Sequence, residues 1–130
     1  MTNVSNLQFL ASDPHKSTWV SASAGAGKTK VLIDRLVRLL VDGAPFSSIL
    51  CFTYTNAGAT EMQHRLRNRL LELSQSAELL LPELLQRAPT EEERARAPNL
   101  YSEFLKNIKA LQIKTIHSFC KDFLEQYSFL

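Results

Sequence analysis

The chain has 130 residues, of which 45% are hydrophobic and 22% are charged, and its formal net charge is +2. This length and composition predict one globular domain and exclude a chain that is disordered throughout or built from collagen-like repeats. No apolar run approaches the roughly 20 residues needed to cross a bilayer, and the two cysteines are too few for a disulfide scaffold. We therefore expect a cytoplasmic protein without a membrane partner.

Three short runs of residues favour β-strands, at 17–21, 49–54 and 111–116. The second run is apolar and aromatic but too short for a helix. The third alternates between apolar and polar residues, so every second side chain from Leu111 onward is predicted to be buried. In the first run we expect Trp19 to pack at an edge of the sheet.

Each run is followed by a helical pattern of apolar residues. The first pattern predicts a helix over 28–41. The second predicts a helix that Thr55 or Asn56 caps and that continues to about Leu73. Ser118 caps the third, whose side chains expected to face inward are Phe119, Cys120, Phe123, Leu124 and Tyr127. An alternation of strand and helix that is repeated three times predicts an α/β fold, with helices flanking a parallel sheet of three strands.

Residues 74–99 differ from the rest of the chain. They contain three prolines and a run of three glutamates, and their apolar residues are few. Proline interrupts the hydrogen bonds of a helix, so we expect short helices broken at the prolines. We interpret this stretch as an insertion that covers the core without forming it.

The segment 22–29, Ala-Ser-Ala-Gly-Ala-Gly-Lys-Thr, lies between the first predicted strand and the first predicted helix. Gly25 and Gly27 permit positive φ angles and a close approach to a ligand, and the backbone N–H groups of such a loop converge on phosphate oxygens. Lys28 would reach the β- and γ-phosphates, and the Thr29 hydroxyl would bind Mg²⁺. The expected nucleotide-binding residues are Ser23, Ala24, Gly25, Ala26, Gly27, Lys28 and Thr29.

A second group of polar residues follows the strand predicted over 49–54. Open α/β sheets bind ligands at the carboxyl ends of their strands. Tyr54 offers a ring on which an unpaired base can stack, and hydroxyl and amide groups can bind phosphates without reading the base sequence. The residues that we expect to contact single-stranded nucleic acid here are Thr53, Tyr54, Thr55 and Asn56.

Three segments together resemble motifs of the UvrD/Rep-type superfamily 1 DNA helicases. They are residues 25–29, 53–62 and 115–120. The stretches 17–25 and 114–120 resemble still more closely the AddA-type helicase–nuclease proteins of double-strand break repair, which share the alanine at Ala22 where the strict phosphate loop has glycine. The resemblance extends over 8–129 and is weakest over 74–99.

The resemblance implies an incomplete RecA-like P-loop NTPase domain and a role for particular residues. It implies that Gln8 reads the adenine edge of ATP. It implies that Lys28 and Thr29 bind the phosphates and Mg²⁺. Tyr54, where the family usually has Phe, and His117 are implied to contact single-stranded DNA.

The resemblance also implies an activity, which is ATP-dependent 3′-to-5′ translocation on single-stranded DNA, coupled to unwinding in double-strand break repair. Residues 1–130 would be the N-terminal part of the ATP-binding domain. The implied partners are single-stranded DNA, the remainder of the helicase and an AddB-type protein. The family's Asp-Glu pair and distal arginines are not in this sequence, so we expect a truncated or split protein that binds ATP weakly and hydrolyses it little.

Two alternatives stay open. A non-enzymatic remnant that binds single-stranded DNA or a partner would be insensitive to Lys28→Ala, whereas Tyr54→Ala and added salt would weaken its DNA binding. A small P-loop kinase ranks last, because it would need a base and lid arginines near an acceptor pocket, and the stretch 91–96 is a poor candidate for them.

Overall fold

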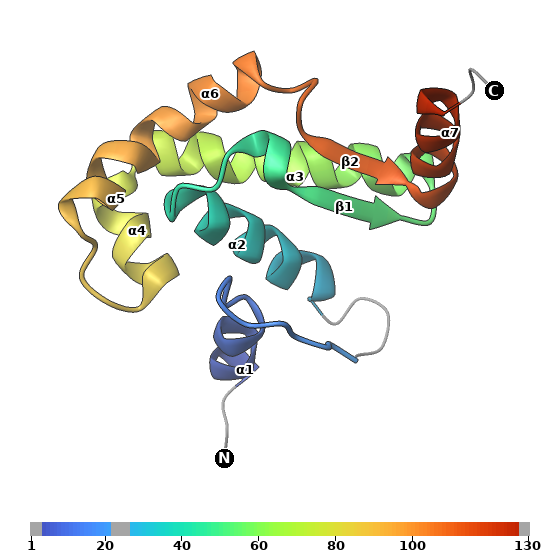
Figure 1. The fold of residues 1–130 in the computed structure, drawn as a ribbon. Helices are drawn as coiled ribbons and strands as arrows, with labels where there is room; N and C mark the ends of the chain where they lie inside the picture. Colours follow the sequence, from blue (N-terminus) through green and yellow to red (C-terminus); the bar gives the residue numbers. More distant parts are fainter. Residues whose placement is uncertain (1–3, 22–26, 128–130) are drawn as a thin grey trace.

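Most elements of the protein pack against one long helix, α3 (Asn56–Gln75), which runs behind the sheet in Figure 1. This computed structural model describes residues 4–21 and 27–127. The Thr55 hydroxyl caps α3 by accepting a hydrogen bond from the Gly58 N–H at 3.0 Å. The buried side chains of α3 recur at helical spacing and are Ala59, Met62, Leu66, Leu70 and Leu73. The prediction for this helix is confirmed.

The sheet has two parallel strands in the part of the chain that the structure describes, β1 (Leu50–Thr53) and β2 (Gln112–Thr115). They are the second and third of the predicted runs. Cys51 pairs with Ile113, and both side chains are buried in the core next to α3. The mixed α/β character, the parallel pairing and the flanking helices are therefore as predicted.

The first predicted strand, at 17–21, is not formed. These residues have no regular secondary structure, and no other strand within the described ranges pairs with them. Trp19 is 93% exposed, so its expected packing at a sheet edge is wrong as well. β-forming residues only favour a strand; the hydrogen bonds of a neighbouring strand are needed to form one.

The helix α2 (Lys28–Val41) has the bounds that the sequence predicts. Its core side chains are Ile33, Leu36, Val37, Leu40 and Val41. Gly43, with a φ of 105°, follows its end, and a 3₁₀ turn, η1 (Phe46–Ser48), leads from there into β1. The helix α1 (Val4–Ala11), which is not among the predicted elements, packs against α2.

Short helices occupy most of the stretch 74–99 and continue into α6. They are α4 (Ala77–Leu85), α5 (Glu91–Arg96), the 3₁₀ turn η2 (Ala97–Asn99) and α6 (Leu100–Lys106). Pro82 lies inside α4, so this helix is not broken at its proline as expected. Side chains of this stretch also belong to the core cluster, namely Leu81, Leu84, Leu85 and Ala97.

The helix α5 begins with a capping box, in which Thr90 and Glu93 each accept a hydrogen bond from the other's backbone N–H. Arg87 donates two hydrogen bonds to the Glu93 carboxylate, at 2.8 and 3.0 Å. These bonds, with those from Thr90, lower the pKa of Glu93 to about 2. Glu93 is therefore a charged group that the fold uses while keeping it nearly buried.

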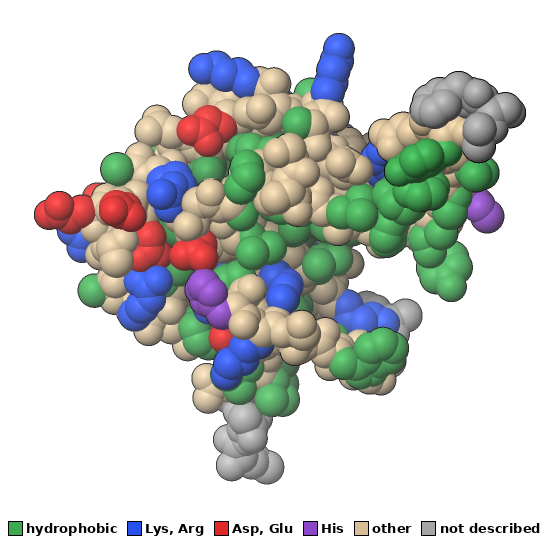
Figure 2. Space-filling view, in the orientation of Figure 1, with side chains coloured by type: hydrophobic (Ala, Val, Ile, Leu, Met, Phe, Trp, Pro, Cys, Tyr) green, Lys and Arg blue, Asp and Glu red, His purple; other side chains and the backbone are tan. Residues whose placement is uncertain are grey.

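The last helix, α7 (Ile116–Gln126), starts two residues earlier than predicted, with Thr115 as its cap. Its apolar side chains do not face inward: Phe123, Leu124 and Tyr127 are at least half exposed, and Cys120 is exposed too. They form much of the green surface over α7 at the right of Figure 2. Periodicity predicts that one side of a helix is apolar, but not that another element covers it.

None of the described helices is long and apolar enough to span a membrane.

Candidate functional site

The start of α2 is built around Gly27. This residue has a φ of 85° and a ψ of 15°, a left-handed conformation that glycine adopts without strain. Glycine offers no side-chain oxygen to the backbone N–H groups of the first helical turn, so these groups can bind an anion. Lys28 is exposed and Thr29 is half-buried directly after it. A phosphate group is the ligand that this arrangement suits.

The side chain of Gln8 lies against Gly27. A Cβ atom added to Gly27 would be 2.9 Å from the Gln8 Nε2 atom, closer than real Cβ contacts come. Gln8 belongs to α1, so the contact brings α1 to the N-terminal end of α2. Gln8 and Lys28, two residues expected from the sequence to share one nucleotide site, thus line the same cleft.

This cleft has a volume of about 410 Å³ and lies between α1, residues 18–21 and the start of α2. Its walls are mainly apolar, and the apolar side chains that line it include Val4, Leu7, Leu10, Trp19 and Val20. Small-molecule sites commonly combine such walls with a few polar groups that fix the ligand's orientation. Here the Gln8 amide and the start of α2 supply those groups.

Four of the expected nucleotide-binding residues lie outside the described residues: Ser23, Ala24, Gly25 and Ala26. Gly27, Lys28 and Thr29 are described. The Thr29 hydroxyl would be one ligand of Mg²⁺, which usually keeps water and phosphate oxygens as its other ligands. No group of three His, Cys, Asp or Glu side chains within the described ranges could hold a metal ion by itself.

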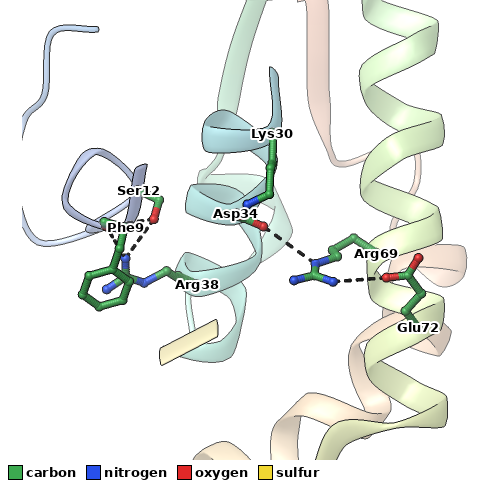
Figure 3. Close-up of polar contacts among 7 residues, drawn as sticks. All are labelled: Phe9, Ser12, Lys30, Asp34, Arg38, Arg69 and Glu72. Atoms are coloured by element: carbon green, nitrogen blue, oxygen red, sulfur yellow. Dashed lines mark hydrogen bonds and ion pairs between the residues drawn. The ribbon is translucent and has the colours of Figure 1, made fainter. Parts of the chain in front are cut away.

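Arg38 connects α2 to the end of α1 (Figure 3). It is 9% exposed, and its Nη1 atom donates to the Phe9 carbonyl and to the Ser12 hydroxyl, both at 2.9 Å. Its guanidinium carbon is 4.3 Å from the centre of the Phe9 ring, a cation–π distance. Burial lowers the pKa of Arg38 from its ordinary value. The side chain thus carries its charge among groups of α1.

Arg35, one turn before Arg38, binds the segment that follows α1. Its guanidinium donates to the Asp13 carbonyl at 2.7 Å and to the Lys16 carbonyl at 2.5 Å. Neither arginine is among the residues predicted from the sequence. The available signal is their spacing, since two arginines three residues apart interrupt the otherwise apolar side of α2.

A chain of ion pairs joins α2 to α3, as Figure 3 also shows. The Lys30 Nζ atom is 2.9 Å from Asp34 on the next turn of α2. Asp34 is 3.7 Å from the Arg69 Nε atom of α3, and Arg69 in turn pairs with Glu72 at 3.1 Å. These contacts hold the helix that carries Lys28 against the helix that begins at the end of β1.

The expected nucleic-acid residues gather at the carboxyl ends of the strands. Thr53 pairs with Thr115 in the sheet, so the residues that follow both strands lie at one edge. Tyr54 is 93% exposed there, and Asn56 and His117 are exposed as well. In Figure 1 the ends of both arrows and the start of α2 lie toward the same side of the molecule.

The threonines at this edge stabilise local structure. The Thr53 hydroxyl donates to the Thr55 carbonyl at 2.9 Å, and the Thr55 hydroxyl accepts the N–H of Gly58. Thr115 caps α7 in the same way, by accepting the Ser118 N–H at 3.1 Å. The exposed side chains of the edge are therefore better placed than these hydroxyls to meet a ligand.

The model of the family described as UvrD/REP helicase N-terminal domain matches residues 2–130. Three relatives from different bacteria each carry a name that describes the larger chain of an ATP-dependent helicase/nuclease. The chain is 32% identical to that of Lactobacillus gasseri over its whole length, 32% to that of Ligilactobacillus salivarius over 95% of it, and 35% to that of Staphylococcus epidermidis over 83%. It spans 9% of the first two relatives and 7% of the third. No solved structure matches the chain.

Proposed function

The chain belongs to the UvrD/REP helicase N-terminal domain family, and on this premise we propose that it is the ATP-binding part of a DNA helicase that acts in repair. We extend to it the ATP dependence that the relatives' names state. The observation that carries the proposal is the contact of Gln8 with Gly27, because it places an amide and a phosphate-binding helix start in one cleft.

Each part of this cleft would act on a different part of ATP. The Gln8 amide can accept from the adenine amino group and donate to N7, as amides do when they bind adenine elsewhere. The apolar walls would enclose the base. Lys28 would neutralise the β- and γ-phosphates, while Thr29 would bind Mg²⁺, which supplies charge neutralisation to the phosphates.

We propose a RecA-like arrangement for the domain. The parallel pairing of β1 with β2, with α2 and α3 as the neighbouring helices, is compatible with it. The phosphate-binding segment 22–29 precedes α2, as the P-loop does in that fold. Nucleotide and nucleic acid would then lie on the side of the sheet where the strands end.

Single-stranded DNA is the proposed polymer ligand of that edge. A ring as exposed as that of Tyr54 can stack on an unpaired base, and such stacking tolerates any sequence. Exposed His117 and Asn56 lie at the same edge and can bind the backbone. Movement in the 3′-to-5′ direction and association with an AddB-type protein belong to the proposal through the family resemblance.

The proposal includes weak hydrolysis by these 130 residues. Phosphoryl transfer depends on groups that align water and stabilise the charge of the transferring group. The described residues of the cleft include a phosphate-binding lysine and, next to it in the chain, a Mg²⁺-binding threonine, but no carboxylate. We expect nucleotide binding to be measurable while turnover stays low.

Calorimetry with ATP and Mg²⁺ tests the binding site. Lys28→Ala removes a charged contact, which is worth about 1.5–3 kcal/mol, so the affinity should fall roughly tenfold to a hundredfold. Lys106→Ala removes an exposed lysine from α6 and serves as the matched control. Equal affinities of the two variants and of the wild type would refute the proposed site.

A second candidate, a protein that binds single-stranded DNA without using ATP, is favoured by the exposure of Tyr54 alone. It predicts that Tyr54→Ala weakens DNA binding and that neither ATP nor Lys28→Ala changes it. ATP-dependent DNA affinity would decide for the helicase.

A further inference from the structure

The helix α1 carries Gln8, yet it is not held in place by a buried apolar side. All eight of its residues are described and none is buried. Val4, Leu7 and Leu10 are each more than half exposed. An isolated helix of this length is not stable in water, so its position depends on the contacts at its carboxyl end.

Arg38 supplies those contacts (Figure 3). It donates to the carbonyl of Phe9, the residue next to Gln8, and lies over the Phe9 ring. Ser12 joins the two, because its hydroxyl accepts from Arg38 and donates to the same carbonyl at 3.0 Å. A cation at the carboxyl end of a helix is also favoured by the helix dipole.

Arg35 fixes the backbone just beyond α1 through the carbonyls of Asp13 and Lys16. The two arginines come from one side of α2, so their contacts set where α1 lies along α2. That position puts the Gln8 amide against Gly27. Lys28 and Thr29 belong to α2 itself and do not need these contacts.

We propose that Arg38, supported by Arg35, is a positioning residue for base recognition: it holds α1 so that Gln8 faces the adenine of a bound nucleotide. This inference rests on the proposed ATP site. It separates two properties of that site, because base preference would depend on Arg38 while binding of the phosphates would not.

Three ligands separate these properties: ATP, GTP and inorganic tripolyphosphate, each with Mg²⁺ and measured by calorimetry. An amide that pairs with adenine meets the O6 acceptor of guanine badly, so the wild type should prefer ATP to GTP by roughly fivefold. In Arg38→Met this ratio should fall to about one, while the affinity for tripolyphosphate stays within about twofold. Arg38→Lys keeps the charge and should restore part of the ratio.

Arg96→Met is the matched control. Arg96 donates to the Val41 carbonyl at the far end of α2, at 2.7 Å, and should leave the ratio unchanged. Partial unfolding of a variant lowers its affinity for ATP and GTP by the same factor, so the ratio is insensitive to it. Gln8→Ala should lose the ratio too, and adding Arg38→Met to it should change nothing more.

A wild-type preference that Arg38→Met retains would overturn the inference, as would a wild type that binds ATP and GTP equally. Failure of the proposed function has a different signature. In that case the wild type would bind none of the three ligands, or Lys28→Ala would leave all three affinities unchanged, and the inference would fall with the site.

Discussion

Replacing Gly27 by alanine tests the contact on which the site depends. The added Cβ would meet two obstacles: a φ of 85°, and the Gln8 Nε2 atom at 2.9 Å. A left-handed backbone costs a residue with a Cβ about 1–2 kcal/mol. The Gln8 amide is the free end of a flexible side chain, so it can move away at little further cost to stability. The substitution should therefore lower the free energy of unfolding by about 1–2 kcal/mol and displace Gln8.

Gly43→Ala is the comparison that separates the two effects. Gly43 has a φ of 105° at the other end of α2, and its added Cβ would meet the Arg96 guanidinium at 3.2 Å, again a flexible group. Urea denaturation should show similar losses of stability for the two variants. Only Gly27→Ala should reduce the preference for ATP over GTP.

The reasoning would be refuted by a Gly27→Ala protein that is destabilised as expected but keeps the wild-type base preference. That result would mean that the contact seen between Gln8 and Gly27 has no part in base recognition. Gly27→Ala in a Gln8→Ala background gives the internal check, since the backbone cost should persist while no preference is left to lose.

Three further outcomes are expected. Leu66→Ala, at a fully buried position of α3, should lower the free energy of unfolding by about 2–5 kcal/mol, whereas Leu79→Ala, 74% exposed, should change it by less than about 0.5 kcal/mol in the same urea titration. The pKa of Glu93 is lower in the folded protein, so its contribution to stability is complete above pH 4.5 and is lost as the pH falls toward about 2; Glu93→Gln should be less stable at pH 7 and should flatten this decline. Tyr54→Ala should weaken binding of a fluorescent single-stranded oligonucleotide by about 1–3 kcal/mol, and equal binding by Tyr127→Ala and Tyr54→Ala would contradict the stacking role.

The sequence predicts the helices α2 and α3 well because their apolar residues repeat over several turns, and each repeat has a core to enter. It predicts β1 and β2 because short runs of alternating or apolar residues have few other uses. The run at 17–21 has the same local appearance, but strand formation depends on a neighbouring strand that can lie anywhere in the chain. Local sequence does not contain that information.

The nucleotide cleft divides in the same way. Gly27 and its lysine neighbour follow from a motif that is contiguous in the sequence. Arg35 and Arg38 do not, because their importance comes from carbonyl groups more than fifteen residues earlier. The exposed aromatic side of α7 is missed for a related reason, since its period is visible in the sequence but its environment is not.

The two strands lie side by side although α3, α4, α5 and α6 separate them along the chain. During synthesis β1 leaves the ribosome long before its neighbour, and only after four helices have followed can the ladder close. Closing so wide a loop has an entropic cost that local helices do not bear. Pairing should therefore be the slow, late event of folding, after the helices have formed a scaffold for it.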